Sequence, residues 1–160
     1  MGAPVPLSAD HDTSGFICRH ESLSTWLSKC ALANAATGEL RTYVRTFVVC
    51  DEQRRVIGYY ALAAGSVASG AAPGRLRRKM SDPLPVIVLG RLAVHGDWSG
   101  RGIGSGLLKN AMLRSIQAAE LIGVRALLCH AIDEEAKAFY PKHGFAESPL
   151  DPLIVLVGLR

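Results

Sequence analysis

The stretch from Trp98 to Leu108, WSGRGIGSGLL, decides the fold of this chain, because it joins an apolar run to a long helical pattern. It holds four glycines, at positions 100, 102, 104 and 106, with Arg101 between the first two. Glycine in the first turn of a helix costs roughly 0.5–1 kcal/mol relative to alanine. We therefore expect an interaction at this junction that offsets the cost.

An anion is the expected partner of this glycine-rich junction. The first N–H groups of a helix have no internal acceptor, the helix dipole is positive there, and glycines leave the backbone bare. The spacing excludes the Walker A and Rossmann loops, because Leu107 and Leu108 follow Gly106 and no G-x-G-x-x-G frame fits. The pattern predicts a bound phosphate, most naturally a pyrophosphate; the alternative is a turn that serves the fold alone.

Outward from this junction, the chain alternates helical and strand patterns. We expect helices over 21–38, 107–123 and 133–140, the last capped by Asp133, and a short helix around 75–80 in a loop over 68–85. We expect strands over 41–50, 56–67, 86–94, 124–132 and 152–159, the first two as a hairpin. This order predicts an α/β fold with a mixed central sheet and helices on both faces, as a single domain over residues 1–160.

Composition narrows the class of protein further. No apolar run approaches the roughly 20 residues of a membrane span, and no secretory signal is visible, so we expect a cytoplasmic protein without a membrane partner. The scattered Cys18, Cys30, Cys50 and Cys129 predict reduced, mostly buried thiols and no metal site.

A basic run lies just before the central strand. It comprises Arg75, Arg77, Arg78 and Lys79 within the sequence GRLRRKM, and the chain as a whole has a net charge of +4. Such a run can neutralise several phosphates of a nucleic acid, so we assign these four residues to RNA binding. A solvated loop is the alternative.

Two motifs carry a resemblance to the general N-acetyltransferase (GNAT) superfamily. The first is the Arg/Gln-x-x-Gly-x-Gly/Ala loop, and the second is DEEAKAFYPKHGF, a short helix ending in tyrosine before Gly-Phe. The resemblance implies the acyl-CoA fold with acetyl-CoA as co-substrate. It assigns the CoA pyrophosphate to Arg101, Gly102, Ile103, Gly104, Ser105 and Gly106, and the pantetheine arm and acetyl carbonyl to Leu92, Ala93 and Val94.

The same resemblance makes Tyr140 the general acid that protonates the departing CoA thiolate. Tyrosine, with a reference pKa of about 10, keeps its proton at neutral pH. The alternative is a core tyrosine whose hydroxyl is satisfied locally. Pro141 disfavours helical geometry at Tyr140, so we expect the helix to loosen there. We expect His143 to be an exposed bystander.

The resemblance extends in finer detail to the TacT-like toxins of type II toxin–antitoxin modules. It covers nearly the whole chain, including Phe-x-Cys before Leu-x-x-Trp-Leu, LGRLAVHGDWSGRGIGSGLL and SPLDPLIVLVGL. It implies acetylation of the amino group of aminoacyl-tRNA, which stops translation. It also implies a homodimer and a cognate ribbon–helix–helix antitoxin, with operator DNA bound only through the antitoxin complex. Ser24 departs from the pattern, where an acidic residue is common.

The chemistry of the acceptor agrees with this resemblance without proving it. The run 86–94 contains no carboxylate that could act as a base. An α-amine titrates near 7.7–8.0, and an adjacent ester lowers its pKa further, so an aminoacyl ester needs little help to lose its proton. Two other functions remain open at this point: an acetyltransferase of a small amine or a protein N-terminus, and a regulator that binds acetyl-CoA without catalysis.

Overall fold

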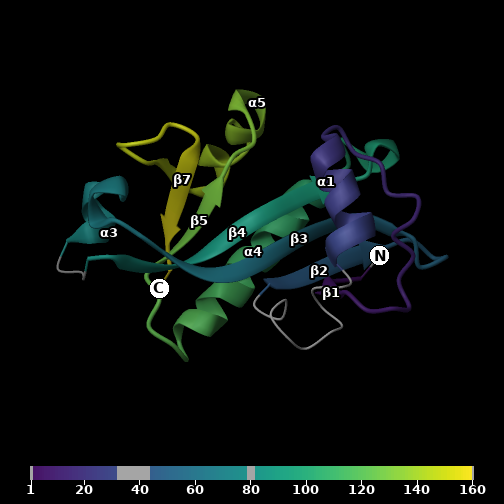
Figure 1. The fold of residues 1–160 in the computed structure, drawn as a ribbon, viewed down its shortest axis with the longest axis horizontal. Coiled ribbons are helices and arrows are strands. Elements are labelled where there is room, and N and C mark those ends of the chain that lie inside the picture. Colours follow the sequence, from purple (N-terminus) through teal and green to yellow (C-terminus); the bar gives the residue numbers. More distant parts are fainter. Residues whose placement is uncertain (1, 32–43, 79–81, 160) are drawn as a thin grey trace. The chain divides into compact units, whose positions relative to one another are not determined.

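The computed structural model describes residues 2–31, 44–78 and 82–159. Its strands form one seven-stranded mixed sheet in the order β1-β2-β3-β4-β5-β7-β6 (Figure 1). The strands are β1 (Val5–Pro6), β2 (Val44–Cys50), β3 (Val56–Val67), β4 (Leu84–Val94), β5 (Ala126–His130), β6 (Ala146–Glu147) and β7 (Ile154–Gly158). Strands β4 and β5 pair in parallel, whereas β1 with β2, β2 with β3, β5 with β7 and β6 with β7 pair antiparallel. The expected α/β fold with a mixed sheet is confirmed.

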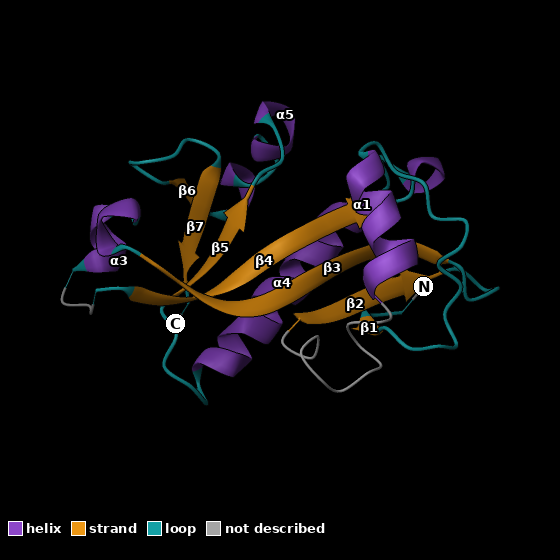
Figure 2. Ribbon diagram, in the orientation of Figure 1, coloured by secondary structure: helices purple, strands orange, loops and turns teal. Residues whose placement is uncertain are grey.

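The helices of the described residues are mostly short, with one exception of 17 residues (Figure 2). They are α1 (Glu21–Trp26), continued by a π-helical turn (Leu27–Ala31), then α3 (Gly74–Arg77), α4 (Ile103–Ala119) and α5 (Glu134–Lys137). Turns of 3₁₀ helix cover Ser69–Ala71, Gly96–Trp98 and Pro141–His143. The expected end of the first helix at Gly38, and Cys30 as a buried thiol, fall outside what the structure describes of the chain.

The backbone falls into two compact units, each with its own core. The first unit comprises residues 1–63 and 90–111, and its core contains Leu27 of the helical N-terminal segment, Val48 and Tyr59 of the hairpin, and Ala93 of β4. Tyr59 and Tyr60 point to opposite faces of β3: Tyr59 bonds to α1 at the Leu23 carbonyl, and Tyr60 bonds to Asn110 of α4. Helices therefore cover both faces of the sheet in this unit.

The second unit comprises residues 64–89 and 112–160. Here β4 pairs in parallel with β5 from Val86↔Ala126 to Leu89↔Cys129, and β5 pairs antiparallel with β7. Leu76 of α3 packs into the core of this unit, where a side chain on Gly158 would collide with it. Within this unit, β4 pairs with β5 as far as Leu89, and β4 itself continues to Val94 in the first unit.

Several expected elements differ in extent from the structure, among them α4, which begins and ends four residues before the expected range 107–123. The last helix is shorter than the expected range 133–140, because its α-helical part ends at Lys137. The strand over 124–132 is limited to Ala126–His130, and β4 begins two residues earlier than expected, at Leu84. The short β1 and β6 were not expected as separate elements.

Candidate functional site

The connection from β4 to α4 needs two glycines for its backbone shape. Gly100 has a φ of 77° and Gly102 a φ of 82°, in the left-handed region that side chains with a Cβ disfavour. These residues turn the chain from the 3₁₀ turn Gly96–Trp98 into α4, which begins at Ile103. The glycine pattern therefore encodes the predicted strand-to-helix junction.

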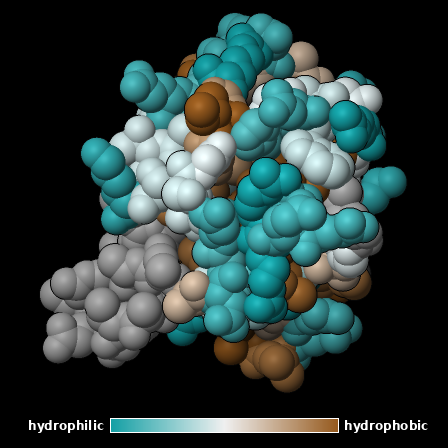
Figure 3. Space-filling model, turned by 90° about the vertical axis from the view of Figure 1, so that its right-hand side faces the viewer, coloured by the Kyte–Doolittle hydropathy of each residue, from teal (hydrophilic) through white to brown (hydrophobic). Residues whose placement is uncertain are grey.

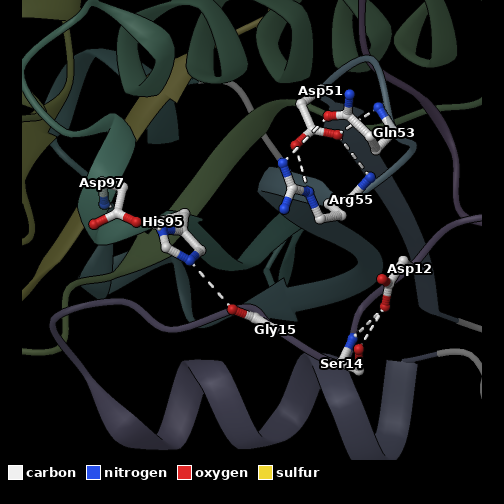
Figure 4. Close-up of polar contacts among 8 residues, drawn as sticks. All are labelled: Asp12, Ser14, Gly15, Asp51, Gln53, Arg55, His95 and Asp97. Carbon is white, nitrogen blue, oxygen red and sulfur yellow. Dashed lines mark hydrogen bonds and ion pairs between the residues drawn. The ribbon is translucent and has the colours of Figure 1, made fainter.

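Hydrogen bonds hold the first part of this connection against two other segments. The N–H of His95 donates to the Ile57 carbonyl at 2.8 Å, and the N–H of Gly96 donates to the Ile17 carbonyl at 2.9 Å. The His95 ring adds two bonds: its Nδ1 accepts from the Asp97 N–H at 3.0 Å, and its Nε2 lies 3.2 Å from the Gly15 carbonyl oxygen (Figure 4). His95 thus ties the N-terminal segment to the residues that lead into the glycine loop.

A cavity of about 180 Å³ lies beside this clamp, lined among others by Asp12, Asp51, Arg55 and His95. Its charged groups already pair with neighbours: Arg55 Nε lies 2.7 Å from Asp51 Oδ2, and Asp12 accepts from the hydroxyl and N–H of Ser14 (Figure 4). Because these polar groups already have partners, we interpret the residues around the cavity as structural support for the loop.

On the face shown in Figure 3, hydrophilic side chains predominate and the apolar ones form small separate groups.

The start of α4 presents backbone amides in open space. The first helical bond runs from the Gly106 N–H to the Gly102 carbonyl at 3.1 Å, so the amides of Ile103 and Gly104 precede it and have no acceptor within the helix. A Cβ at Gly100, Gly102 or Gly106 would meet no atom within 4 Å, so the space over the loop is open. An anion can approach these amides closely.

The remaining loop and strand residues assigned by resemblance also belong to the first unit. The Arg101 guanidinium lies 4.7 Å from the centroid of the Trp98 ring, a cation–π contact that holds this exposed charge next to the loop. Ala93 is buried, whereas Leu92 and Val94 are half-buried. All three lie on the part of β4 beyond its pairing with β5.

Tyr140 lies in the second unit and is 6% exposed. Its ring meets Phe139 and Phe145 edge-on at centroid distances of 5.3 Å each, and its hydroxyl interacts with the Cys129 thiol of β5. Burial, followed by the charge and the hydrogen bond of Cys129, raises the pKa of Tyr140. The hydroxyl therefore carries its proton at neutral pH.

The expected departure of Tyr140 from helical geometry is wrong: its φ of −79° and ψ of −37° lie in the right-handed helical region. The α-helix ends earlier, at Lys137, and Tyr140 is the N-cap of the 3₁₀ turn Pro141–His143. The expectation for His143 is wrong. The residue is half-buried, and its ring centroid lies 5.1 Å from that of Phe139, because the 3₁₀ turn brings it back over the aromatic cluster.

The basic run lies on and after α3. Arg75, Arg77 and Arg78 are exposed, whereas Leu76 between them is buried and anchors the turn. Lys79, the fourth residue of the predicted run, lies outside the described residues. The structure thus presents at least three guanidinium groups to solvent from one short element.

Sequence reasoning missed two residues that support the candidate site, Cys129 beside Tyr140 and His95 beside the glycine loop. Cys129 was expected only as a buried thiol, and its interaction with Tyr140 joins residues eleven positions apart on different elements. Nothing in the sequence indicated the role of His95, because a single histidine after a strand has no distinctive spacing.

Within the described parts of the chain, no group of three or more His, Cys, Asp or Glu residues could hold a metal ion, and no helix is long and apolar enough to cross a membrane.

Comparison with known proteins places this geometry in a family. Residues 43–147 match the family model of the acetyltransferase (GNAT) domain. The chain is 49% identical over 158 residues to a tRNA-acetylating toxin of Mycobacterium tuberculosis, an alignment that covers 99% of this chain and 92% of that protein.

Two solved structures extend the comparison. AtaT complexed with acetyl-methionyl-tRNAfMet is 25% identical, with a TM-score of 0.88 over 98% of this chain and 94% of that one. A structure of AtaTR bound with AcCoA is 26% identical, with a TM-score of 0.81 over 98% of this chain and 92% of that one.

Proposed function

Because the chain belongs to the GNAT acetyltransferases and, within them, to the tRNA-acetylating toxins, we propose that it transfers acetyl from acetyl-CoA to the α-amino group of aminoacyl-tRNA and thereby stops translation. The observation that carries this proposal is the 49% identity to a tRNA-acetylating toxin along 99% of the chain. The open loop at the start of α4 and the exposed arginines of α3 agree with the two substrates.

We assign the loop residues 101–106 to the CoA pyrophosphate, through the bare amides at the start of α4. Leu92, Ala93 and Val94 follow the last β4–β5 pair, so their outer backbone groups are not used by β5 and are suited to pair with the pantetheine arm. The exposed Arg75, Arg77 and Arg78, with Lys79, are assigned to tRNA phosphates.

In the proposed reaction, the α-amino nitrogen bonds to the acetyl carbonyl carbon and the carbon–sulfur bond of acetyl-CoA breaks. Tyr140 donates its hydroxyl proton to the CoA sulfur, the amine loses one proton to water, and the tyrosine regains a proton from water. The raised pKa of Tyr140 keeps that proton in place until a thiolate develops. An α-amine with a pKa near 7.7–8.0, lowered further by the adjacent ester, is largely neutral at cellular pH and needs no buried base.

The assembly follows the same proposal. We propose a single GNAT domain over residues 1–160, a homodimer, and a cytoplasmic location, where charged tRNA is found. We also propose neutralisation by a cognate ribbon–helix–helix antitoxin, through which the complex reaches operator DNA. Size measurement in solution and co-purification with the product of a neighbouring small gene test the dimer and the antitoxin.

The decisive experiment supplies the purified protein with labelled acetyl-CoA and a pool of charged tRNAs. We expect label on the amino group of one or a few aminoacyl species, identified after mild hydrolysis of the ester. Label on small amines or peptide N-termini at equal rates, without dependence on RNA, would support the general acetyltransferase. Binding of acetyl-CoA with no label on any acceptor would support the non-catalytic regulator.

A further inference from the structure

Arg91 is a charged side chain on β4 that the assignments above leave without a role. It lies immediately before Leu92–Val94 and is half-buried. Its guanidinium carbon lies 4.3 Å from the centroid of the Trp26 ring, at the end of α1. By the alternation of side chains along a strand, Arg91 shares a face of β4 with Ala93, which belongs to the core beneath α1.

The ring that supports Arg91 is held rigidly. Trp26 stacks on Tyr59 with a centroid distance of 5.8 Å and an interplanar angle of 17°. Tyr59 is fully buried, its hydroxyl donates to the Leu23 carbonyl at 2.7 Å, and Phe16 meets its ring edge-on. The indole ring that the Arg91 guanidinium contacts is therefore held in place before any ligand arrives.

The charge of Arg91 has no carboxylate partner among the described residues. Burial raises the pKa of Tyr59, the nearby charge of Arg91 lowers it, and Cys18 raises it. Stacking on an indole uses the face of the guanidinium and leaves its in-plane N–H donors available. A half-buried guanidinium with unused N–H donors is therefore suited to bind an anionic group of a ligand.

We propose that Arg91, stacked on Trp26, binds a phosphodiester in the 3′-terminal nucleotides of the acceptor. This inference rests on the proposed function, because it takes the acetyl group to lie at Leu92–Val94. A strand rises about 3.3 Å per residue, so the backbone of Arg91 lies within about 7 Å of Ala93. An acceptor whose terminal ester reaches the acetyl group brings its last phosphodiester to the same region.

The contact has a specific consequence for substrate choice. All tRNAs end in the same three nucleotides, so a bond to this phosphodiester adds affinity without distinguishing one tRNA from another. Arg91 is therefore a contact for the common end of the substrate, separate from the arginines of α3, which we assign to the phosphates of the tRNA body.

Two matched acceptors test the proposal. One is adenosine with the amino acid joined through a 3′-amide, which resists hydrolysis and has no phosphate; the other is the CCA trinucleotide with the same terminus. We expect Arg91→Met to lower the ratio of kcat/KM between trinucleotide and nucleoside by about tenfold to hundredfold, the range for a lost charged hydrogen bond. Arg91→Lys, which keeps the charge and loses the plane, recovers part of this ratio.

The control variant is Lys109→Met, which removes one positive charge from the exposed side of α4 and leaves the ratio unchanged. The melting temperature and the acetyl-CoA affinity are measured on every variant. Trp26→Phe keeps an aromatic ring under Arg91, so it should retain more of the trinucleotide-to-nucleoside ratio of kcat/KM than Trp26→Leu. An unchanged ratio in a folded Arg91→Met protein, or equal losses on both acceptors, overturns the phosphate contact.

Binding of the uncharged CCA trinucleotide decides the proposal without catalysis. We expect Arg91→Met to weaken this binding about tenfold or more, and equal affinity overturns the inference. If the parent protein acetylates neither acceptor, nor charged tRNA, the proposed function fails while the trinucleotide titration still decides the role of Arg91. If an acidic hexapeptide binds through Arg91 while the CCA trinucleotide does not bind, the site belongs to a protein partner and the proposal is overturned.

Discussion

At the residue scale, the hydroxyl of Tyr140 has two possible roles to distinguish, one as a catalytic acid and one as a structural hydrogen-bonding group. We expect Tyr140→Phe to lower kcat by about 10²–10⁴-fold, the usual contribution of a general acid, with little change in acetyl-CoA affinity. The ring packing on Phe139 and Phe145 remains, so the fold should persist. Steady-state kinetics and calorimetric titration with acetyl-CoA check both parts.

The same variant decides between catalysis and a purely structural hydroxyl, because Cys129 already offers that hydroxyl a partner. A structural bond would cost about 1 kcal/mol of unfolding free energy and leave turnover nearly normal below the melting temperature. Turnover within about threefold of the parent, with a lowered melting temperature, would contradict the general-acid assignment. Expression in growing cells gives a second readout, because a large loss of turnover should relieve the toxicity.

At the element scale, the start of α4 carries the next prediction. Gly106→Glu places a carboxylate at an exposed position where a Cβ meets no atom within 4 Å, so the variant should fold. We expect acetyl-CoA binding to be lost, because the carboxylate repels the pyrophosphate from the helix amides. Gly123→Glu is the matched control, since Gly123 is exposed with equally open space. Equal acetyl-CoA affinity in the two variants, measured by calorimetry, would remove the phosphate role of the loop.

The short helix α3 carries a separate prediction about RNA. Replacing Arg75, Arg77 and Arg78 by alanine leaves the buried Leu76 in place, so the helix should keep its anchor in the core. We expect weaker tRNA binding and a flatter dependence of log Kd on log salt, because fewer counterions are released. Acetyl-CoA affinity should not change. A salt slope equal to that of the parent protein would make the run a solvated loop.

The elements also show what sequence patterns reveal and where they stop. The glycines, the apolar run 86–94 and the helical spacing after them predicted β4, the loop and α4, because each of these patterns follows from local backbone geometry. The two-residue strands β1 and β6 are too short for any period, and they exist because they pair with β2 and β7. Contacts such as Cys129 with Tyr140, or Arg91 with Trp26, depend on tertiary packing that no spacing encodes.

At the scale of the whole molecule, buried acidic groups couple stability to pH. Burial raises the pKa of Tyr59 in one unit and of Tyr140 in the other, and it raises the pKa of the Cys129 thiol from 9.0 to about 11. In the unfolded chain these groups lose their protons at their ordinary values. The folded state holds the protons longer, so the two states differ in bound protons only above about pH 8.5–9.

We therefore expect the free energy of unfolding to be flat with respect to these groups from pH 7 to about 8.5 and to fall as pH rises beyond about 9. The sign follows because the unfolded state binds fewer protons there, and each such group contributes a slope of up to about 1.4 kcal/mol per pH unit. Urea unfolding at about pH 8, 9 and 10 measures the decline. Cys129→Val keeps an apolar side chain of similar size and removes the thiol, so its curve should fall less steeply between about pH 9 and 10. Parallel curves for the variant and the parent would show that the Cys129 thiol titrates alike in the folded and unfolded states, and that its burial does not contribute to the alkaline loss of stability.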